Sequence, residues 1–190
     1  FCVNAISGLD GLEPTLKLIP FSKNILIANK ESIICGWDLI NKRLKKYKSN
    51  FVPLDSEHYS IYELIKNEKN ENINKIILTA SGGPFLNKSK KDILNIKPKH
   101  ALNHPNWKMG KKISIDSSTM MNKVFELIEA TKIFNLSKKK FSILVHTNSY
   151  IHAIVFFKGE LIKLLAHETD MKIPISNALG IKNPNKTNVI

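Results

Sequence analysis

The sequence predicts an α/β fold in which a parallel sheet comes first and a set of antiparallel strands follows. Two short buried strands, at 2–6 and 24–28, are separated by a helix at about 11–19, the order of a βαβ unit in a parallel sheet. Further on, two apolar strands meet at Lys158-Gly159, which indicates an antiparallel hairpin. The 190 residues are 43% hydrophobic, so the chain can build a substantial core in one or two domains.

The other elements follow in order. Apolar residues at helical intervals predict a helix at 31–48, and we expect this first segment to end at residue 50. A second segment, expected at 51–180, opens with a change of pattern. Its predicted elements are a short strand from 51, a helix near 59–69, a strand at 76–80, a short helix within 87–99, a loop at 100–112, a helix at 118–134, and an antiparallel set of strands at 141–146, 150–157 and 160–166. Solvated loops are expected at 66–75 and 182–188, the second within a linker at 181–190.

The net charge of +13 comes almost wholly from lysine, because Arg43 is the sole arginine. Basic runs at 42–48 and 138–140 could bind nucleic acid non-specifically, but no nucleic-acid fold signature accompanies them. Solvated lysine faces are therefore the better interpretation, with no nucleic-acid partner expected. No apolar run reaches the roughly 18 residues of a membrane span, so no membrane partner is expected either. Cys2 and Cys35 match no metal or redox spacing.

The run 116–126 carries the first candidate site. It opens with three residues that cap helices well, and the N–H groups of a helix start can bind a phosphate. Asn122, Lys123 and Glu126 follow at helical spacing, so an amide, an ammonium and a carboxylate share one side of that helix. The pattern suits a metal-bound, phosphorylated ligand. Alone, it would suit the polar face of an amphipathic helix equally well.

Two other segments supply complementary chemistry. Asp55 and Glu57 stand two residues apart at an expected strand end, where both would point to one side. Together with Glu126 they give three carboxylates, a set suited to Mg²⁺ or Mn²⁺. A solvated Asp-x-Glu after a proline is the commoner case for that motif alone. The turn 81–83, Ser-Gly-Gly, can curl its amides around an anion or can simply end the strand at 76–80.

These segments belong to an ordered set that resembles one family, the 1-deoxy-D-xylulose 5-phosphate reductoisomerases. The matching stretches are 4–15, 26–32, 53–58, 81–85, 104–110 and 112–123. The resemblance implies the end of a Rossmann-like NADPH-binding domain followed by an α+β catalytic domain with a mixed sheet. It also implies an NADP-dependent oxidoreductase of the non-mevalonate isoprenoid pathway. The reaction would isomerise and reduce 1-deoxy-D-xylulose 5-phosphate to 2-C-methyl-D-erythritol 4-phosphate.

The resemblance also implies roles for individual residues. The ligands of Mg²⁺, Mn²⁺ or Co²⁺ would be Asp55, Glu57 and Glu126, and the catalytic residues Lys30, Glu57 and His104. The phosphorylated sugar would contact Ser56, Ser81, His104, Trp107, Ser117, Asn122, Lys123 and Glu126. NADPH would contact Ala5, Ile6, Asn29, Lys30, Glu31, Met109, Gly110 and Met171. Segment 100–112 would be a lid that closes and expels water. Ser149 and His152 are expected to act only in support.

The chain also departs from the family. No glycine-rich dinucleotide loop is present, and Thr147, Asn148 and Thr169 stand where the family usually has Pro, Gln and Pro. We therefore expect an internal fragment that lacks a C-terminal helical domain and is inactive alone. Alternatives are a non-catalytic metal- and phosphate-binding paralogue or a basic nucleic-acid module. A homodimer is expected for the full-length enzyme. Frequent Lys, Asn and Ile suggest a plastid location if the source is eukaryotic, or otherwise a bacterial cytoplasm.

Overall fold

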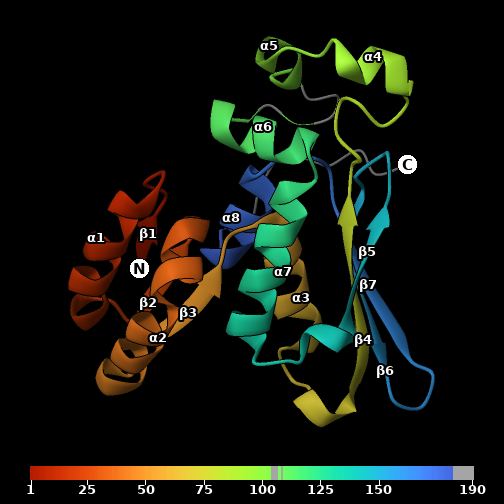
Figure 1. Ribbon diagram of the computed structural model, residues 1–190. Coiled ribbons are helices and arrows are strands. Elements are labelled where there is room, and N and C mark those ends of the chain that lie inside the picture. The colour runs from red at the N-terminus through yellow and green to blue at the C-terminus, as the bar shows by residue number, and fades with distance from the viewer. Residues whose placement is uncertain (104–106, 108, 182–190) are drawn as a thin grey trace.

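The computed structural model describes residues 1–103, 107 and 109–181, which form two sheets and the helices around them (Figure 1). The first sheet is parallel, with strands β1 (Cys2–Asn4), β2 (Asn24–Ile27) and β3 (Asn50–Pro53) in that order. The second sheet has the order β5-β4-β6-β7, from strands β4 (Ile73–Ala80), β5 (Phe141–Val145), β6 (Ile151–Phe157) and β7 (Ile162–Ala166). Helices α3 (Ser56–Ile65) and α7 (Met121–Phe134) lie between the two sheets in Figure 1.

The first sheet confirms the predicted βαβ order. Helix α1 (Leu12–Leu18) joins β1 to β2, with short 3₁₀ helices on either side at Leu9–Gly11 and Ile19–Phe21. Strand β3 pairs with β2, so it belongs to this sheet although we expected residue 51 to open the second segment.

Helix α2 (Lys30–Tyr47) packs its apolar face against this sheet. Its start is fixed by Asn29, whose side chain accepts a hydrogen bond from the Ser32 amide. Ile33, Trp37 and Ile40 recur at helical spacing and are buried against Ile25 and Ile27 of β2. The helix therefore holds its first residue, Lys30, at the carboxyl edge of the parallel sheet.

The second sheet packs on α3 and α7, and its strand order corrects one prediction. Strands β6 and β7 form the expected antiparallel hairpin, and β6 is also antiparallel to β4. Strand β5, however, pairs parallel with β4 on the side away from β6, so the three strands are not one antiparallel set. The chain between β4 and β5 contains α7, a crossover long enough to return the strand in the same direction.

Several predicted boundaries were wrong. Strand β4 begins at the fully buried Ile73, inside the stretch expected to be a loop at 66–75, and α3 begins at Ser56 because Asp55 caps it. One short helix was expected within 87–99, but two start there, α4 (Lys90–Leu94) and α5 (Pro98–Ala101). Helix α8 (Lys172–Ala178) was not predicted. Short 3₁₀ turns lie at Asn70–Asn72 and Lys138–Lys140.

The helix predicted at 118–134 is two helices. Helix α6 (Lys111–Ser118) ends before Met120, whose left-handed backbone (φ 62°) separates it from α7. Ser117 and Ser118 are therefore the last residues of α6 and do not cap α7. The helix start that was predicted to offer its N–H groups to a phosphate is the start of α7, at Met121. The predicted loop at 100–112 also overlaps the beginning of α6.

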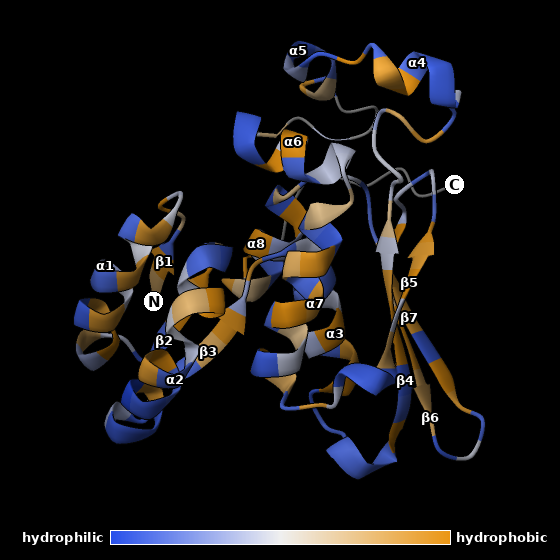
Figure 2. Ribbon diagram, viewed as in Figure 1, coloured by the Kyte–Doolittle hydropathy of each residue, from blue (hydrophilic) through white to orange (hydrophobic). Residues whose placement is uncertain are grey.

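Hydrophobic residues run along β5 and β7 on the edges of the second sheet (Figure 2). Leu144, Ile162 and Leu164 are each about half exposed. Among the described residues, no helix combines the length and apolar character that crossing a bilayer requires. The predicted loop at 182–188 lies outside the described residues.

Candidate active site

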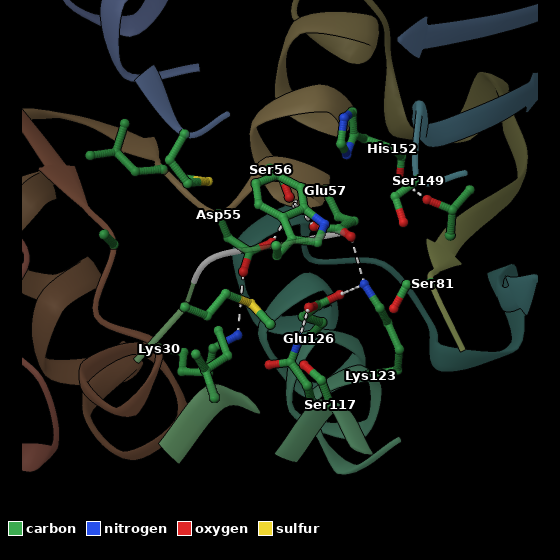
Figure 3. Close-up of a pocket in the computed structure, with 18 residues that line it drawn as sticks. Lys30, Asp55, Ser56, Glu57, Ser81, Ser117, Lys123, Glu126, Ser149 and His152 are labelled. Carbon is green, nitrogen blue, oxygen red and sulfur yellow. Dashed lines mark hydrogen bonds and ion pairs between the residues drawn. The ribbon is translucent and has the colours of Figure 1, made fainter. Parts of the chain in front are cut away.

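Three helices begin beside one cavity of about 200 Å³ (Figure 3). Its walls include Lys30 from α2, Ser56 from α3 and Lys123 from α7. The predicted site residues in its wall are Lys30, Asp55, Ser56, Glu57, Ser81, Trp107, Met109, Ser117, Asn122, Lys123, Glu126 and Met171. His104, predicted as catalytic and substrate-binding, lies outside the described residues.

The three carboxylates predicted to bind a metal converge. One oxygen from each of Asp55, Glu57 and Glu126 lies within 4.8 Å of the others. The reason differs from the predicted one: Asp55 is not at a strand end but is the N-cap of α3, and its Oδ1 accepts a hydrogen bond from the Glu57 amide at 3.2 Å. Glu126 reaches the same point from α7 and is 1% exposed.

Lys123 sits between two of these carboxylates. Its Nζ lies 2.6 Å from Glu57 Oε1 and 2.6 Å from Glu126 Oε2, while Asn122 Nδ2 donates to Glu126 Oε1 at 2.5 Å. Burial and, after it, repulsion from Glu57 raise the pKa of Glu126 to about 8, although Lys123 works in the opposite direction. Lys123 thus only partly compensates the negative charge that these carboxylates crowd together.

This donor set fits a hard divalent cation. Carboxylate oxygens are the ligands that Mg²⁺ and Mn²⁺ prefer. In addition, the buried Oδ1 of Asn122 has no hydrogen-bond partner among the described residues, which leaves a further oxygen acceptor at the site. Asp55, Glu57 and Glu126 could therefore share one ion in place of the Lys123 ammonium.

Lys30 forms a second buried ion pair beside the first. Its Nζ lies 3.3 Å from Asp55 Oδ2 and 3.6 Å from Glu129 Oε2. Burial alone would lower the pKa of Lys30, but the nearby carboxylates outweigh burial and raise it above its usual range. Burial would raise the pKa of Asp55, yet Lys30 and His58 hold it well below its usual range. Both groups are therefore charged at neutral pH.

Sequence reasoning missed His58 and Glu129. His58 Nε2 donates to the Glu126 backbone oxygen at 2.9 Å, and its Nδ1 lies 3.6 Å from Asp55 Oδ1. Both residues had a signal, because each follows a predicted metal ligand by three positions and so shares its helix face.

The four residues predicted to hold a phosphate line the same cavity. They are Ser81, Ser117, Asn122 and Lys123. The Gly83 amide, however, donates to Ser81 Oγ at 3.2 Å and is not free to face an anion as predicted. Gly83 has a φ of 71°, and a Cβ there would lie 2.7 Å from the Ser117 oxygen. Glycine therefore lets the turn after β4 approach the end of α6 closely.

A second cavity of about 510 Å³ adjoins the first. Five of the residues predicted for NADPH line it: Ala5, Ile6, Asn29, Glu31 and Gly110. Lys30 lines both cavities and stands at their junction, whereas Met109 and Met171 line only the first. The Asn29 side chain is occupied by the backbone, because its Nδ2 donates to the carbonyl oxygens of Ile6 and Gly8. Asn29 thus shapes the wall instead of offering free polar atoms to a ligand.

Trp107 and Met109, both in the segment predicted to be a lid, line the first cavity. The ring centroid of Trp107 lies 6.0 Å from that of His152 in an edge-on contact. His152 and Ser149, expected only in support, line the cavity as well. The His152 ring stacks on His167 at 3.7 Å, and burial lowers the pKa of His152 and that of His167, the latter to about 4.

Two family models match more than half of the chain between them. One, described as 1-deoxy-D-xylulose 5-phosphate reductoisomerase, matches residues 1–36. The other, described as the C-terminal domain of the same enzyme, matches residues 51–134.

Similar proteins carry the same name. A 1-deoxy-D-xylulose 5-phosphate reductoisomerase of Pelagibacter ubique (strain HTCC1062) is 63% identical over 182 residues, which cover 96% of this chain and 47% of the relative. One from Wolbachia pipientis subsp. Culex pipiens (strain wPip) is 48% identical over 179 residues, 94% of this chain and 46% of the relative. The chain thus spans about half the length of the curated relatives it matches.

Solved structures agree with this match. A crystal structure of DOX-P reductoisomerase in complex with NADPH, fosmidomycin and magnesium superposes with a TM-score of 0.88 and 42% identity, covering 99% of this chain and 48% of that one. The Zymomonas mobilis 1-deoxy-D-xylulose 5-phosphate reductoisomerase in complex with NADPH gives a TM-score of 0.87 and 36% identity, covering 97% and 48%.

Proposed function

Since the chain belongs to the 1-deoxy-D-xylulose 5-phosphate reductoisomerase family, we propose that its protein converts 1-deoxy-D-xylulose 5-phosphate to 2-C-methyl-D-erythritol 4-phosphate. The reaction combines isomerisation with NADPH-dependent reduction and serves the non-mevalonate isoprenoid pathway. The observation that carries this proposal is the position of Lys30 at the junction of two cavities, one of which holds three converging carboxylates.

A divalent ion held by Asp55, Glu57 and Glu126 would polarise the substrate carbonyl and stabilise negative charge that develops on its oxygen. Lys30 supplies a permanent positive charge beside the same cavity, where it stabilises that charge too. Ser56 hydrogen-bonds the substrate next to the carboxylates.

Ser81, Ser117, Asn122 and Lys123 hold the phosphate. That end of the substrate does not react, so its binding energy orients the end that does. Trp107, which lines the cavity beside His152, would help to exclude water from it. The residues that line the second cavity would hold the nicotinamide coenzyme, which would supply the hydride for the reduction.

The test is an NADPH oxidation assay on the gene product that carries this chain, with 1-deoxy-D-xylulose 5-phosphate and Mg²⁺ or Mn²⁺. We expect turnover that a chelator abolishes, with the product identified by mass spectrometry. Glu126→Gln should lower kcat, and Glu63→Gln, at a surface pair with Lys66, should not. Binding of Mn²⁺ and NADPH without turnover would favour a non-catalytic paralogue.

We also propose a homodimer in the bacterial cytoplasm. The half-exposed apolar residues of β5 and β7 support a second copy of the protein as the partner of the second sheet. Light scattering would measure the assembly. The relatives described above are bacterial, which favours this location over the plastid expected for a eukaryotic source. Neither a membrane nor nucleic acid is proposed as a partner.

A further inference from the structure

Glu129 is a buried carboxylate that lines neither of the two cavities. It lies on α7 and is 1% exposed. An ionised group buried this deeply is costly unless an opposite charge compensates it. Its surroundings therefore indicate what it does.

The nearest opposite charge is the ammonium of Lys30, although burial still raises the pKa of Glu129 to about 7. Glu129 Oε2 lies 3.6 Å from Lys30 Nζ and 3.9 Å from His58 Nδ1, and this oxygen has no hydrogen-bond partner among the described residues. Lys30 is the first residue of α2, and its other anionic partner is Asp55, the N-cap of α3. The carboxylates of Asp55, at the N-cap of α3, and Glu129, on α7, thus hold the Lys30 ammonium in place from two sides.

A second metal ion is a weaker explanation for this cluster. Asp55, His58 and Glu129 bring ligand atoms within 4.8 Å of one another. Asp55 already belongs to the first ligand set, so a second divalent ion there would lie close to the first ion as well as within reach of the Lys30 ammonium, which is 3.3 Å from Asp55 and 3.6 Å from Glu129.

We infer that Glu129 is a positioning residue for the proposed reaction: with Asp55, it holds the Lys30 ammonium at the junction of the two cavities. This inference rests on the proposed function. Glu129 itself touches no substrate and acts through Lys30. Its removal should reduce the catalytic step and spare both the metal site and the phosphate contacts.

Kinetics of Glu129→Gln, Lys30→Met and the double variant test the inference. Glu129→Gln should lower kcat by about 10- to 100-fold, as is typical when a residue that orients a functional group is lost. KM and Mn²⁺ affinity should change less than about twofold. In the Lys30→Met background, Glu129→Gln should cause no further loss, because its effect passes through Lys30. Glu129→Asp should restore part of kcat, and Glu63→Gln is the matched control.

A second measurement reads Lys30 directly. The rate at which acetic anhydride acetylates Lys30, followed by mass spectrometry, should rise severalfold in Glu129→Gln because the ammonium loses a partner. Unchanged acetylation, or additive losses of kcat in the double variant, would overturn the inference. If the parent protein shows no turnover, the proposed function fails and acetylation alone decides the role of Glu129. If Glu129→Gln does not fold, Glu129→Asp replaces it: its smaller loss of kcat should again disappear in the Lys30→Met background, and an additive loss would overturn the inference.

Discussion

Lys123 Nζ lies 2.6 Å from Glu57 Oε1, so the first turn of α7 is tied to the first turn of α3 by a buried ion pair. The same ammonium makes an equal contact with Glu126. Both carboxylates are proposed metal ligands, and Lys123 is also proposed to bind the phosphate. The Lys123 ammonium therefore has two proposed partners, the carboxylates and the phosphate. A cation that binds the carboxylates would replace the ammonium there and leave it free to bind the phosphate.

Metal and phosphate binding should consequently favour each other. We expect methyl phosphate to increase Mn²⁺ affinity by about fivefold or more, within the usual range of coupling between sites, and Mn²⁺ to increase phosphate affinity equally. Titration calorimetry with each ligand, in the presence and absence of the other, measures both. Lys123→Met should abolish the coupling, whereas Lys17→Met, at an exposed pair, should not. Independent binding of the two ligands would contradict this prediction.

Glu57→Gln should remove most of the stabilisation by Mn²⁺. The parent protein should gain roughly 3 kcal/mol at an ion concentration about 100 times Kd, and Tm should rise by several degrees. The variant loses one of three carboxylate ligands, so its Tm should respond weakly to the ion. Thermal unfolding with and without Mn²⁺ is the measurement, with Glu63→Gln as control. A full response in Glu57→Gln would remove this residue from the ligand set.

Asn29→Asp should weaken NADPH binding although the side chain keeps an oxygen for the Ser32 amide. The variant loses the donor to the Ile6 and Gly8 oxygens, which costs about 1–3 kcal/mol and releases the loop that walls the second cavity. Fluorescence titration with NADPH and thermal unfolding measure the two effects. Asn95→Asp, at an exposed position, is the control. Unchanged NADPH affinity would show that the loop does not depend on Asn29.

His167 should make the protein less stable in acid. Burial and then its neighbour His152 lower the pKa of His167 to about 4 from an ordinary 6.5, although Glu168, Glu57 and Asp170 act in the opposite direction. Between these values the unfolded state binds more protons, so stability is complete above pH 6.5 and falls as the pH drops towards 4. His167→Phe should recover about 2 kcal/mol at pH 5 relative to pH 7.5. Denaturant unfolding at both pH values measures this, and parallel profiles for the two proteins would refute it.

Local patterns predicted the parts of the fold that depend on local interactions. Helix α2 followed from its apolar spacing, and the β6–β7 hairpin from its glycine turn. The break at Met120 could not be predicted, because methionine is a good helix former and a positive φ is uncommon for any residue other than glycine. The position of β5 depends on a partner strand more than sixty residues earlier.

The site, too, has a part that local sequence patterns predict and a part that only tertiary packing creates. Asn122, Lys123 and Glu126 share one helix face, so their spacing alone brought them together. The pairing of Lys30 with Glu129 joins residues about a hundred positions apart, and only the packing of α2 on α7 creates it. The Asn29 side chain was assigned to a ligand because its bonds to the 6–8 loop cannot be seen in sequence.

Because Lys30 lines both cavities, a single inhibitor molecule that filled them together would have to pass its ammonium. A neutral hydrocarbon tether at that point would strip water from a buried cation and gain nothing in return. A tether carrying a carbonyl, ether or carboxylate oxygen would give the ammonium a third acceptor besides Asp55 and Glu129. An inhibitor designed to fill both cavities should therefore carry an oxygen atom in the part of its tether that passes Lys30.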